Sequence, residues 1–157
     1  MFDFLSLFAS ATLAQAAPPA DAEQEEPHVV MWVAARPESC NLALATRTSL
    51  EALVTEPQRW EGKCVAVDGF WQESALFAVA RDARRRYAQS NDSLRGRRVG
   101  IYGTEELLAS APRTPVAYTA VGIAGQCDAL AEGAIMVMGY CHYTGGPYIA
   151  VAEMHRR

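Results

Sequence analysis

The sequence places a cysteine directly beside a histidine, Cys141 and His142, in the stretch GYCHYTGGPY at residues 139–148. Zinc sites commonly take closely spaced cysteine and histidine pairs, and a catalytic thiolate needs a base beside it. None of the usual metal spacings links the pair to the other candidate ligands, Cys127, His28 and His155. In a strand, moreover, neighbouring side chains point to opposite faces, so one metal ion could not readily bind both Cys141 and His142. We therefore expect neither a metal nor catalysis here, and keep a metal-binding or thiol-dependent enzyme centred on Cys141 and His142 as the alternative.

The four cysteines are better explained as two disulfides. Their number is even and they form no CxxC motif, which is typical of proteins in an oxidising compartment. Four cysteines allow three pairings, and the sequence does not decide among them. We favour Cys40 with Cys64 and Cys127 with Cys141, because the members of each pair are closest along the chain. Each crosslink would stabilise the fold by about 3 kcal/mol.

Arginines crowd one short region of the chain, residues 81–98, with Tyr87 among them: Arg81, Arg84, Arg85, Arg86, Arg95, Arg97 and Arg98. One interpretation is a basic patch that binds phosphate, an anionic polysaccharide or a single strand, with Arg84, Arg85 and Arg86 as its contacts. The other is a solvated loop whose arginines pair with nearby acidic residues. The net charge of the whole chain is -4, which argues against nucleic acid as the partner.

Aromatic residues recur along the apolar runs: Trp60, Phe70, Trp71, Phe77, Tyr118, Tyr140, Tyr143 and Tyr148. Aromatic side chains on strands more often pack in a core than bind a ligand. Trp71 and Tyr140 lie close to glycines, and we select them as candidate binding residues of a groove. The chain has no GxSxG, GxxxxGK or GxGxxG motif, so we expect a protein that is not an enzyme and needs no cofactor.

The N-terminus resembles a targeting segment. Residues 4–14, FLSLFASATLA, are apolar but too short to span a bilayer, and they lead into the small-x-small pattern Ala14-Gln15-Ala16. We expect a signal peptide at 1–16, cleaved after Ala16 to leave no transmembrane segment; a buried N-terminal helix is the alternative. Residues 17–27, APPADAEQEEP, are expected to form a disordered acidic tether. Residues 28–157 would then be a single β-rich domain, a length that can bury a core.

Apolar periodicity predicts the elements of this domain. A short strand is expected at 28–34, a helix over 48–55 capped by Thr48 or Ser49, a long strand within 60–72 and a further strand at 75–80, followed by a polar loop or short helix over 82–94. Later in the chain we expect a strand at 98–102, a helical turn over 104–109 begun by Thr104, and a strand at 116–124. A hairpin is predicted between 134–143 and 148–154, across the glycine turn at 144–147.

Runs of strands with glycines inside them fit a small, coiled barrel. Glycines inside the strands, at Gly69, Gly122 and Gly139, would permit the sharp bends of barrel corners. The stretch SLEALVTEPQRWEGKCVAVDGFW, within about residues 49–72, resembles the opening of small exported bacterial OB-fold-like domains. The resemblance implies a mainly β, five-stranded barrel with a short N-terminal helix, and it carries over no binding site.

These observations together predict an exported, non-enzymatic binding domain, periplasmic or secreted, whose partner is a protein of the cell envelope or an anionic ligand. A disulfide-stabilised structural scaffold is the third possibility. The three hypotheses differ in what the surface must offer: a basic contact region, an open thiol or metal site, or neither.

Overall fold

The structure is a computed structural model that describes residues 39–85, 88–128 and 139–157. The predicted signal peptide, the tether and the strand at 28–34 lie outside these residues. Within the described ranges, the helices are too short or too polar for any of them to cross a membrane.

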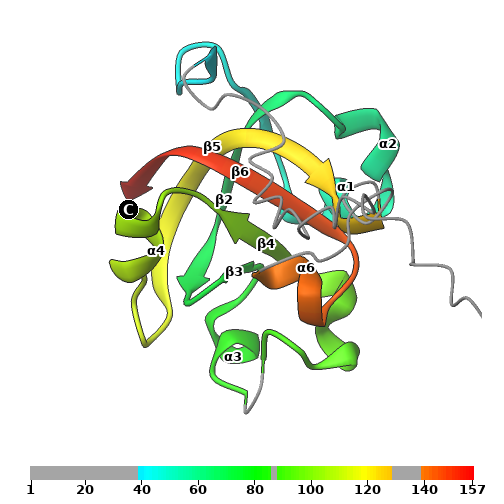
Figure 1. Cartoon of the computed structure of the whole chain (residues 1–157), viewed down its shortest axis with the longest axis vertical. Helices are drawn as coiled ribbons and strands as arrows, with labels where there is room; N and C mark the ends of the chain where they lie inside the picture. Colours follow the sequence, from blue (N-terminus) through cyan, green and yellow to red (C-terminus); the bar gives the residue numbers. More distant parts are fainter. Residues whose placement is uncertain (1–38, 86–87, 129–138) are drawn as a thin grey trace, which may run out of the picture.

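The described strands form one sheet that closes on itself (Figure 1). Its strands are β1 (Thr46–Thr48), β2 (Cys64–Gln72), β3 (Ala75–Phe77), β4 (Arg98–Tyr102), β5 (Val116–Gln126) and β6 (Pro147–Arg156). Their order is β1-β2-β3-β4-β6-β5, and β5 pairs with β2 to close a barrel of the five strands β2 to β6. The pairs β1–β2 and β4–β6 are parallel, and the other pairs are antiparallel. The prediction of a mainly β, five-stranded barrel is confirmed, and the arrangement is consistent with an OB-like fold.

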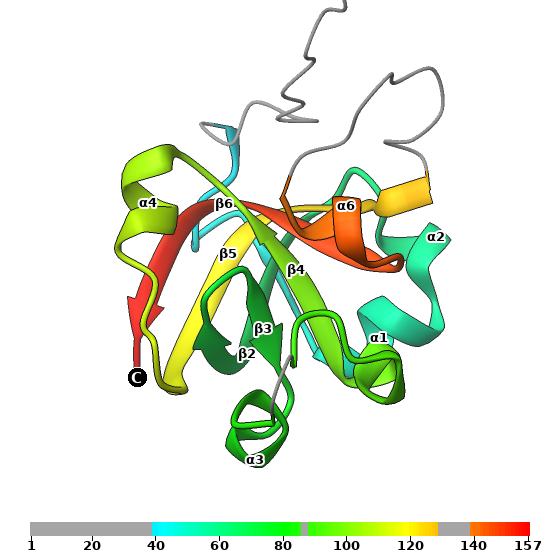
Figure 2. The same ribbon diagram turned by 60° about the horizontal axis from the view of Figure 1, so that its bottom comes forward.

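Short helices surround the barrel: α1 (Leu50–Thr55), α2 (Pro57–Trp60), α3 (Ala80–Ala83), the 3-10 helix η2 (Asp92–Arg97), α4 (Glu105–Ala109) and α6 (Tyr140–Tyr143). Figures 1 and 2 place α1 and α2 at one end of the barrel and α4 at the other. The predicted caps are confirmed. Ser49 Oγ accepts the Ala52 N–H at 3.1 Å, and Thr104 Oγ1 accepts the Leu107 N–H at 3.3 Å. Each cap satisfies a helix N–H that has no partner inside the helix.

The main core fills the barrel. On β4, Val99 and Ile101 alternate into it, and Ile149 on β6 joins them. Leu50 and Leu53 of α1 add to this cluster from one end of the barrel (Figure 1). Burying an aliphatic side chain of this size stabilises the fold by roughly 1.5–3 kcal/mol.

A second core lies on the outer face of the barrel. The alternate residues of β4, Arg98, Gly100 and Tyr102, face away from the interior and are covered by other segments of the chain. The buried residues of this second core come from several elements, and we call them the outer cluster: Ala75, Phe77, Ala83, Ala88, Leu94, Cys127, Tyr140, Tyr148 and Ala150. Tyr102, Ile123 and Cys141 are partly buried and pack against the outer cluster. Figure 2 shows α6 on this side of the barrel and α3 below β2 and β3. The outer face of β3, β4 and β6 is therefore interior to the molecule.

Two predictions about local structure are wrong in part. The strand expected at 75–80 ends at Phe77, and α3 begins at Ala80. The hairpin partner expected at 134–143 is a helix where it is described, since residues 140–143 form α6; residues 134–138 lie outside the description. The antiparallel partner of β6 is β5 instead. The helical turn at 140–143 lets the ring of Tyr140 pack over β4, a tertiary contact that outweighs the strand preference of aromatic residues.

Both favoured disulfides are confirmed. Cys40 is bonded to Cys64, and Cys127 is bonded to Cys141, so all four cysteines of the chain are crosslinked. The first bond fixes the loop before β1 to the start of β2. The second joins the end of β5 to α6. Such bonds persist in an oxidising compartment.

Candidate functional site

The clearest concentration of charge lies around α3 and η2. Seven arginines and two aspartates occur within residues 81–98, a net charge of +5 in a chain whose total is -4. Five of these arginines are exposed in the described structure, and we call them the arginine surface: Arg81, Arg84, Arg85, Arg95 and Arg97. Of the predicted binding residues, Arg84 and Arg85 thus lie on this surface, whereas Arg86 lies outside the described residues.

One buried carboxylate joins the two parts of the arginine surface. Asp82 is fully buried, and its Oδ2 lies 3.3 Å from Arg97 Nη1 while its Oδ1 lies 3.8 Å from Arg85 Nε. The side chains of Arg85 and Arg97 remain 45% and 55% exposed. Since both guanidinium groups lie against the same carboxylate, α3 and the end of η2 are held next to each other with their positive groups at the surface.

The aspartates do not neutralise the arginine surface. Asp92 pairs with Arg95 at 3.4 Å, and both side chains are well exposed, so solvent screens this contact. Within the described part of the chain, neither Arg81 nor Arg84 has a carboxylate at ion-pair distance. Their guanidinium groups are available for the paired hydrogen bonds that arginine makes to phosphate, sulfate or carboxylate.

Apolar residues between the arginines fix the backbone of this region to the barrel. Ala83, Ala88 and Leu94 are 1%, 2% and 0% exposed and belong to the outer cluster. The Ala78 N–H also donates to the Arg97 carbonyl at 3.1 Å, which ties the end of η2 to the segment after β3. The small or apolar residues between the arginines therefore anchor this loop to the barrel, and the arginines of the arginine surface remain exposed.

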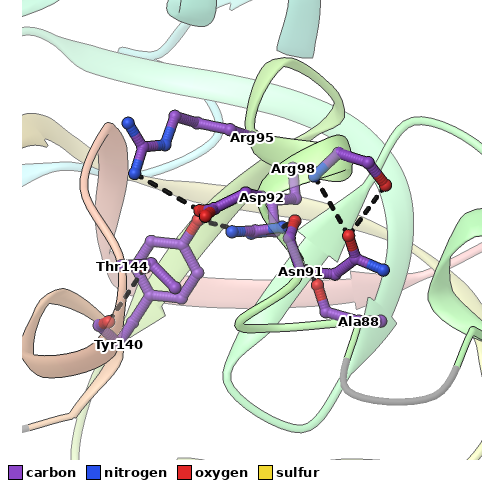
Figure 3. Close-up of polar contacts among 8 residues, drawn as sticks. Ala88, Asn91, Asp92, Arg95, Arg98, Tyr140 and Thr144 are labelled. Atoms are coloured by element: carbon purple, nitrogen blue, oxygen red, sulfur yellow. Dashed lines mark hydrogen bonds and ion pairs between the residues drawn. The ribbon is translucent and has the colours of Figure 1, made fainter.

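The last arginine of the region is not on the surface. Arg98, the first residue of β4, is 0% exposed. Figure 3 shows its guanidinium group between the hydroxyl of Tyr140 and the main chain of Ala88 and Asn91. The sequence analysis missed this difference between Arg98 and its neighbours. The alternation of RVGIY was a usable signal, because it places Arg98 on the same face as Gly100 and Tyr102.

The two aromatic candidates lie in the core. Trp71 is 2% exposed; its Nε1 donates to the Glu73 carbonyl at 2.8 Å, and its ring meets Tyr118 edge to face at 5.2 Å between centroids. Tyr140 is 3% exposed and packs over β4. The structure does not bring either residue to the arginine surface as an exposed contact. Binding by Trp71 or Tyr140 stays a prediction, and we do not include them in the site.

Tyr140 belongs to a group of three tyrosines on the outer face. The rings of Tyr102 and Tyr148 meet edge to face at 5.2 Å between centroids, and the hydroxyl of Tyr102 accepts the Cys141 N–H at 2.9 Å. Burial raises the pKa of Tyr102 above its usual value, although the hydrogen bond from Cys141 opposes the shift. Burial, with smaller contributions from the charges of Tyr102 and Glu61, raises the pKa of Tyr148 to about 12. Tyr102 and Tyr148 are thus neutral near neutral pH, and all three tyrosines pack in the cover over β4.

The sulfur of Cys141 is bonded to Cys127, so the thiolate that a nucleophile or a metal ligand requires is absent while this bond is closed. His142 beside it is exposed. In the described ranges, no group of three or more His, Cys, Asp or Glu side chains is arranged to hold a metal ion.

Comparison with known protein families, with curated proteins and with solved structures gives no match to this chain.

Proposed function

We propose that this chain is an exported binding domain of the cell envelope or periplasm, not an enzyme, and that it holds an anionic partner on the arginine surface. The observation that carries the proposal is the pair of exposed guanidinium groups, Arg85 and Arg97, which lie against the same buried carboxylate, that of Asp82. A carboxylate below the surface keeps both groups in place. The exposed N–H groups of Arg85 and Arg97 remain available to bind an anion.

Two further features support the proposal. The surface concentrates positive charge on a chain of net charge -4, so an anion would be directed to one region and not spread over the molecule. The two disulfides fit a protein that works in an oxidising compartment, where polyanionic lipids and polysaccharides of the envelope are accessible partners.

The test is a comparison of two triple variants that remove the same charge. One is R81A/R84A/R85A, within the arginine surface. The control is R47A/R113A/R156A, three exposed arginines outside it that make no ion pair in the described structure. Each protein is measured for binding to immobilised heparin, as a sulfated polysaccharide, and to vesicles of phosphatidylglycerol and phosphatidylcholine, over a range of salt concentrations.

We expect the first variant to bind about tenfold more weakly, since three exposed contacts of roughly 0.5 kcal/mol each sum to about 1.5 kcal/mol. The control should bind nearly as the original protein does. Equal weakening by both variants would show only a dependence on net charge, and unchanged binding by the first would refute the surface assignment. Absence of binding by the original protein to either probe would favour the structural scaffold.

A further inference from the structure

We infer that Arg98 is the positioning residue of the arginine surface: from inside the molecule it fixes residues 88–91, and through them both parts of that surface. The inference rests on the proposed function for the meaning of the surface. That the buried guanidinium group of Arg98 holds residues 88–91 in place follows from the contacts of Arg98 alone.

Three hydrogen bonds place the guanidinium group. Nη1 donates to the carbonyl oxygen of Ala88 at 3.1 Å and to that of Asn91, and Nε donates to the hydroxyl of Tyr140 at 3.1 Å. Figure 3 shows Arg98 with Tyr140, Ala88 and Asn91 around it. One side chain thereby joins β4 to the main chain of the arginine region and to α6.

The environment of this cation is unusual. Arg98 is fully buried, yet within the described ranges it has no carboxylate partner, and its Nη2 has no hydrogen-bond acceptor. The buried carboxylate nearby in sequence, Asp82, is engaged by Arg85 and Arg97 instead. Burying a charge without a counter-ion is unfavourable, and arginine does not lose its proton in proteins. The side chain is thus held by neutral oxygens, chiefly main-chain carbonyls, whose positions it determines in return.

The two carbonyls lie at the ends of residues 88–91, and each leads to one part of the surface. Asn91 precedes η2: its Oδ1 accepts the Ser93 N–H at 3.0 Å and its carbonyl accepts the Leu94 N–H at 2.9 Å. Fixing Asn91 therefore fixes the start of the helix that carries Arg95 and Arg97.

On the other side, the Ala88 N–H donates to the Arg85 carbonyl at 3.1 Å, which connects the same anchor to the end of the α3 segment. A guanidinium group offers several donors in a rigid planar fork, whereas an ammonium group is a compact charge on a flexible stem. Lysine at this position would keep the charge but would not reproduce the fork.

The experiment uses the full chain with four substitutions. Arg98→Lys keeps the charge, Arg98→Met removes it with a side chain of similar length, and Tyr140→Phe removes only the hydroxyl that accepts from Nε. Tyr148→Phe is the matched control, a buried tyrosine of the same outer cluster whose hydroxyl makes no hydrogen bond to Arg98 in the described structure. Each variant is checked for native circular dichroism, then measured for heparin binding and for amide hydrogen exchange by mass spectrometry.

We expect Arg98→Met to exchange faster in peptides covering 88–97 but not in peptides covering β5, and to bind heparin about tenfold more weakly. Arg98→Lys should retain only part of the exchange protection in 88–97 and only part of the heparin affinity. Tyr140→Phe should lose less of each than Arg98→Met does. Tyr148→Phe should resemble the original protein in both measurements. If Arg98→Met does not fold, Arg98→Lys and Tyr140→Phe carry the comparison.

Exchange that is unchanged, or that rises equally in all peptides, would overturn the inference, because Arg98 would then be an ordinary core residue. Faster exchange in 88–97 with undiminished binding would overturn it too. If the original protein binds no heparin and no anionic vesicles, the proposed function fails, and the exchange pattern alone upholds or rejects the anchoring of 88–91 by Arg98.

Discussion

The ring of Tyr140 occupies the space that a side chain on Gly100 would need. A Cβ atom on Gly100 would lie 2.2 Å from Cδ1 and 2.6 Å from Cγ of Tyr140. These ring atoms are close to the main chain of α6, so the clash cannot be relieved by moving only the tip of a flexible side chain. The cover over β4 therefore depends on the absence of a side chain at one position.

We expect Gly100→Ala to lower the free energy of unfolding by about 1–3 kcal/mol, because the variant overpacks a closed contact. Urea denaturation measures the loss. Gly96→Ala is the control, since a Cβ on Gly96 meets nothing within 4 Å. A loss at Gly100 no larger than that at Gly96 would mean that α6 does not pack on β4 as described.

The cysteines should be inaccessible to alkylation in the native protein. Both disulfides are closed, so we expect no adduct on the untreated protein, even when it is unfolded, and four adducts after reduction. Intact-mass measurement with and without reductant gives the count. Adducts before reduction would return Cys141 to consideration as a nucleophile or metal ligand.

Removal of the second disulfide should lower stability by about 3 kcal/mol, the chain-entropy value for a loop of about 15 residues. The variant is Cys127→Ser with Cys141→Ser, whose sequence separation is 14. Thermal and urea unfolding both measure the effect. Fully reduced protein, which lacks the Cys40–Cys64 bond as well, should show a larger loss than the variant. Full stability of the variant would show that packing alone holds α6 in place.

Alkaline pH should destabilise the fold through Tyr148. The pKa of this residue is about 12 in the folded chain against 10.0 when unperturbed. Between these values the unfolded chain releases the proton while the folded chain retains it, so the free energy of unfolding falls as the pH rises from 10 to 12. Unfolding followed across this range should show the decrease, and Tyr148→Phe should make it smaller. An identical pH profile for the two proteins would contradict the burial of the hydroxyl.

Much of the barrel could be predicted because its strands alternate. The bounds of β4 were predicted correctly, and β2, β5 and β6 were located to within a few residues. Core residues recur at every second position, as Val65 and Val67 do on β2 and Val99 and Ile101 on β4. The helix α1 was predicted from its apolar periodicity and from a cap at Thr48 or Ser49, and Ser49 is the residue that caps it. The three residues of β1 gave too short a pattern to detect.

The parts that could not be predicted depend on contacts between distant segments. Tyr140 lies in a stretch rich in aromatic residues that favours a strand. The helical turn there is favoured by a contact distant in sequence, because the ring of Tyr140 packs where a side chain on Gly100 would otherwise lie. The arginine region was recognised as a unit, but charge alone does not reveal that Asp82 and Arg98 are buried while their neighbours are exposed. Asp82 and Arg98 are buried because the arginine region packs against the outer face of the barrel at these two positions.

The first disulfide also decides how the domain would respond to a pulling force. Cys40 is bonded to Cys64 at the start of β2, and β2 pairs with β1, β3 and β5. Tension applied through the preceding residues would thus pass across the sulfur bridge into the strand with the most neighbours. The short β1 lies between the two bonded cysteines and would carry none of this load.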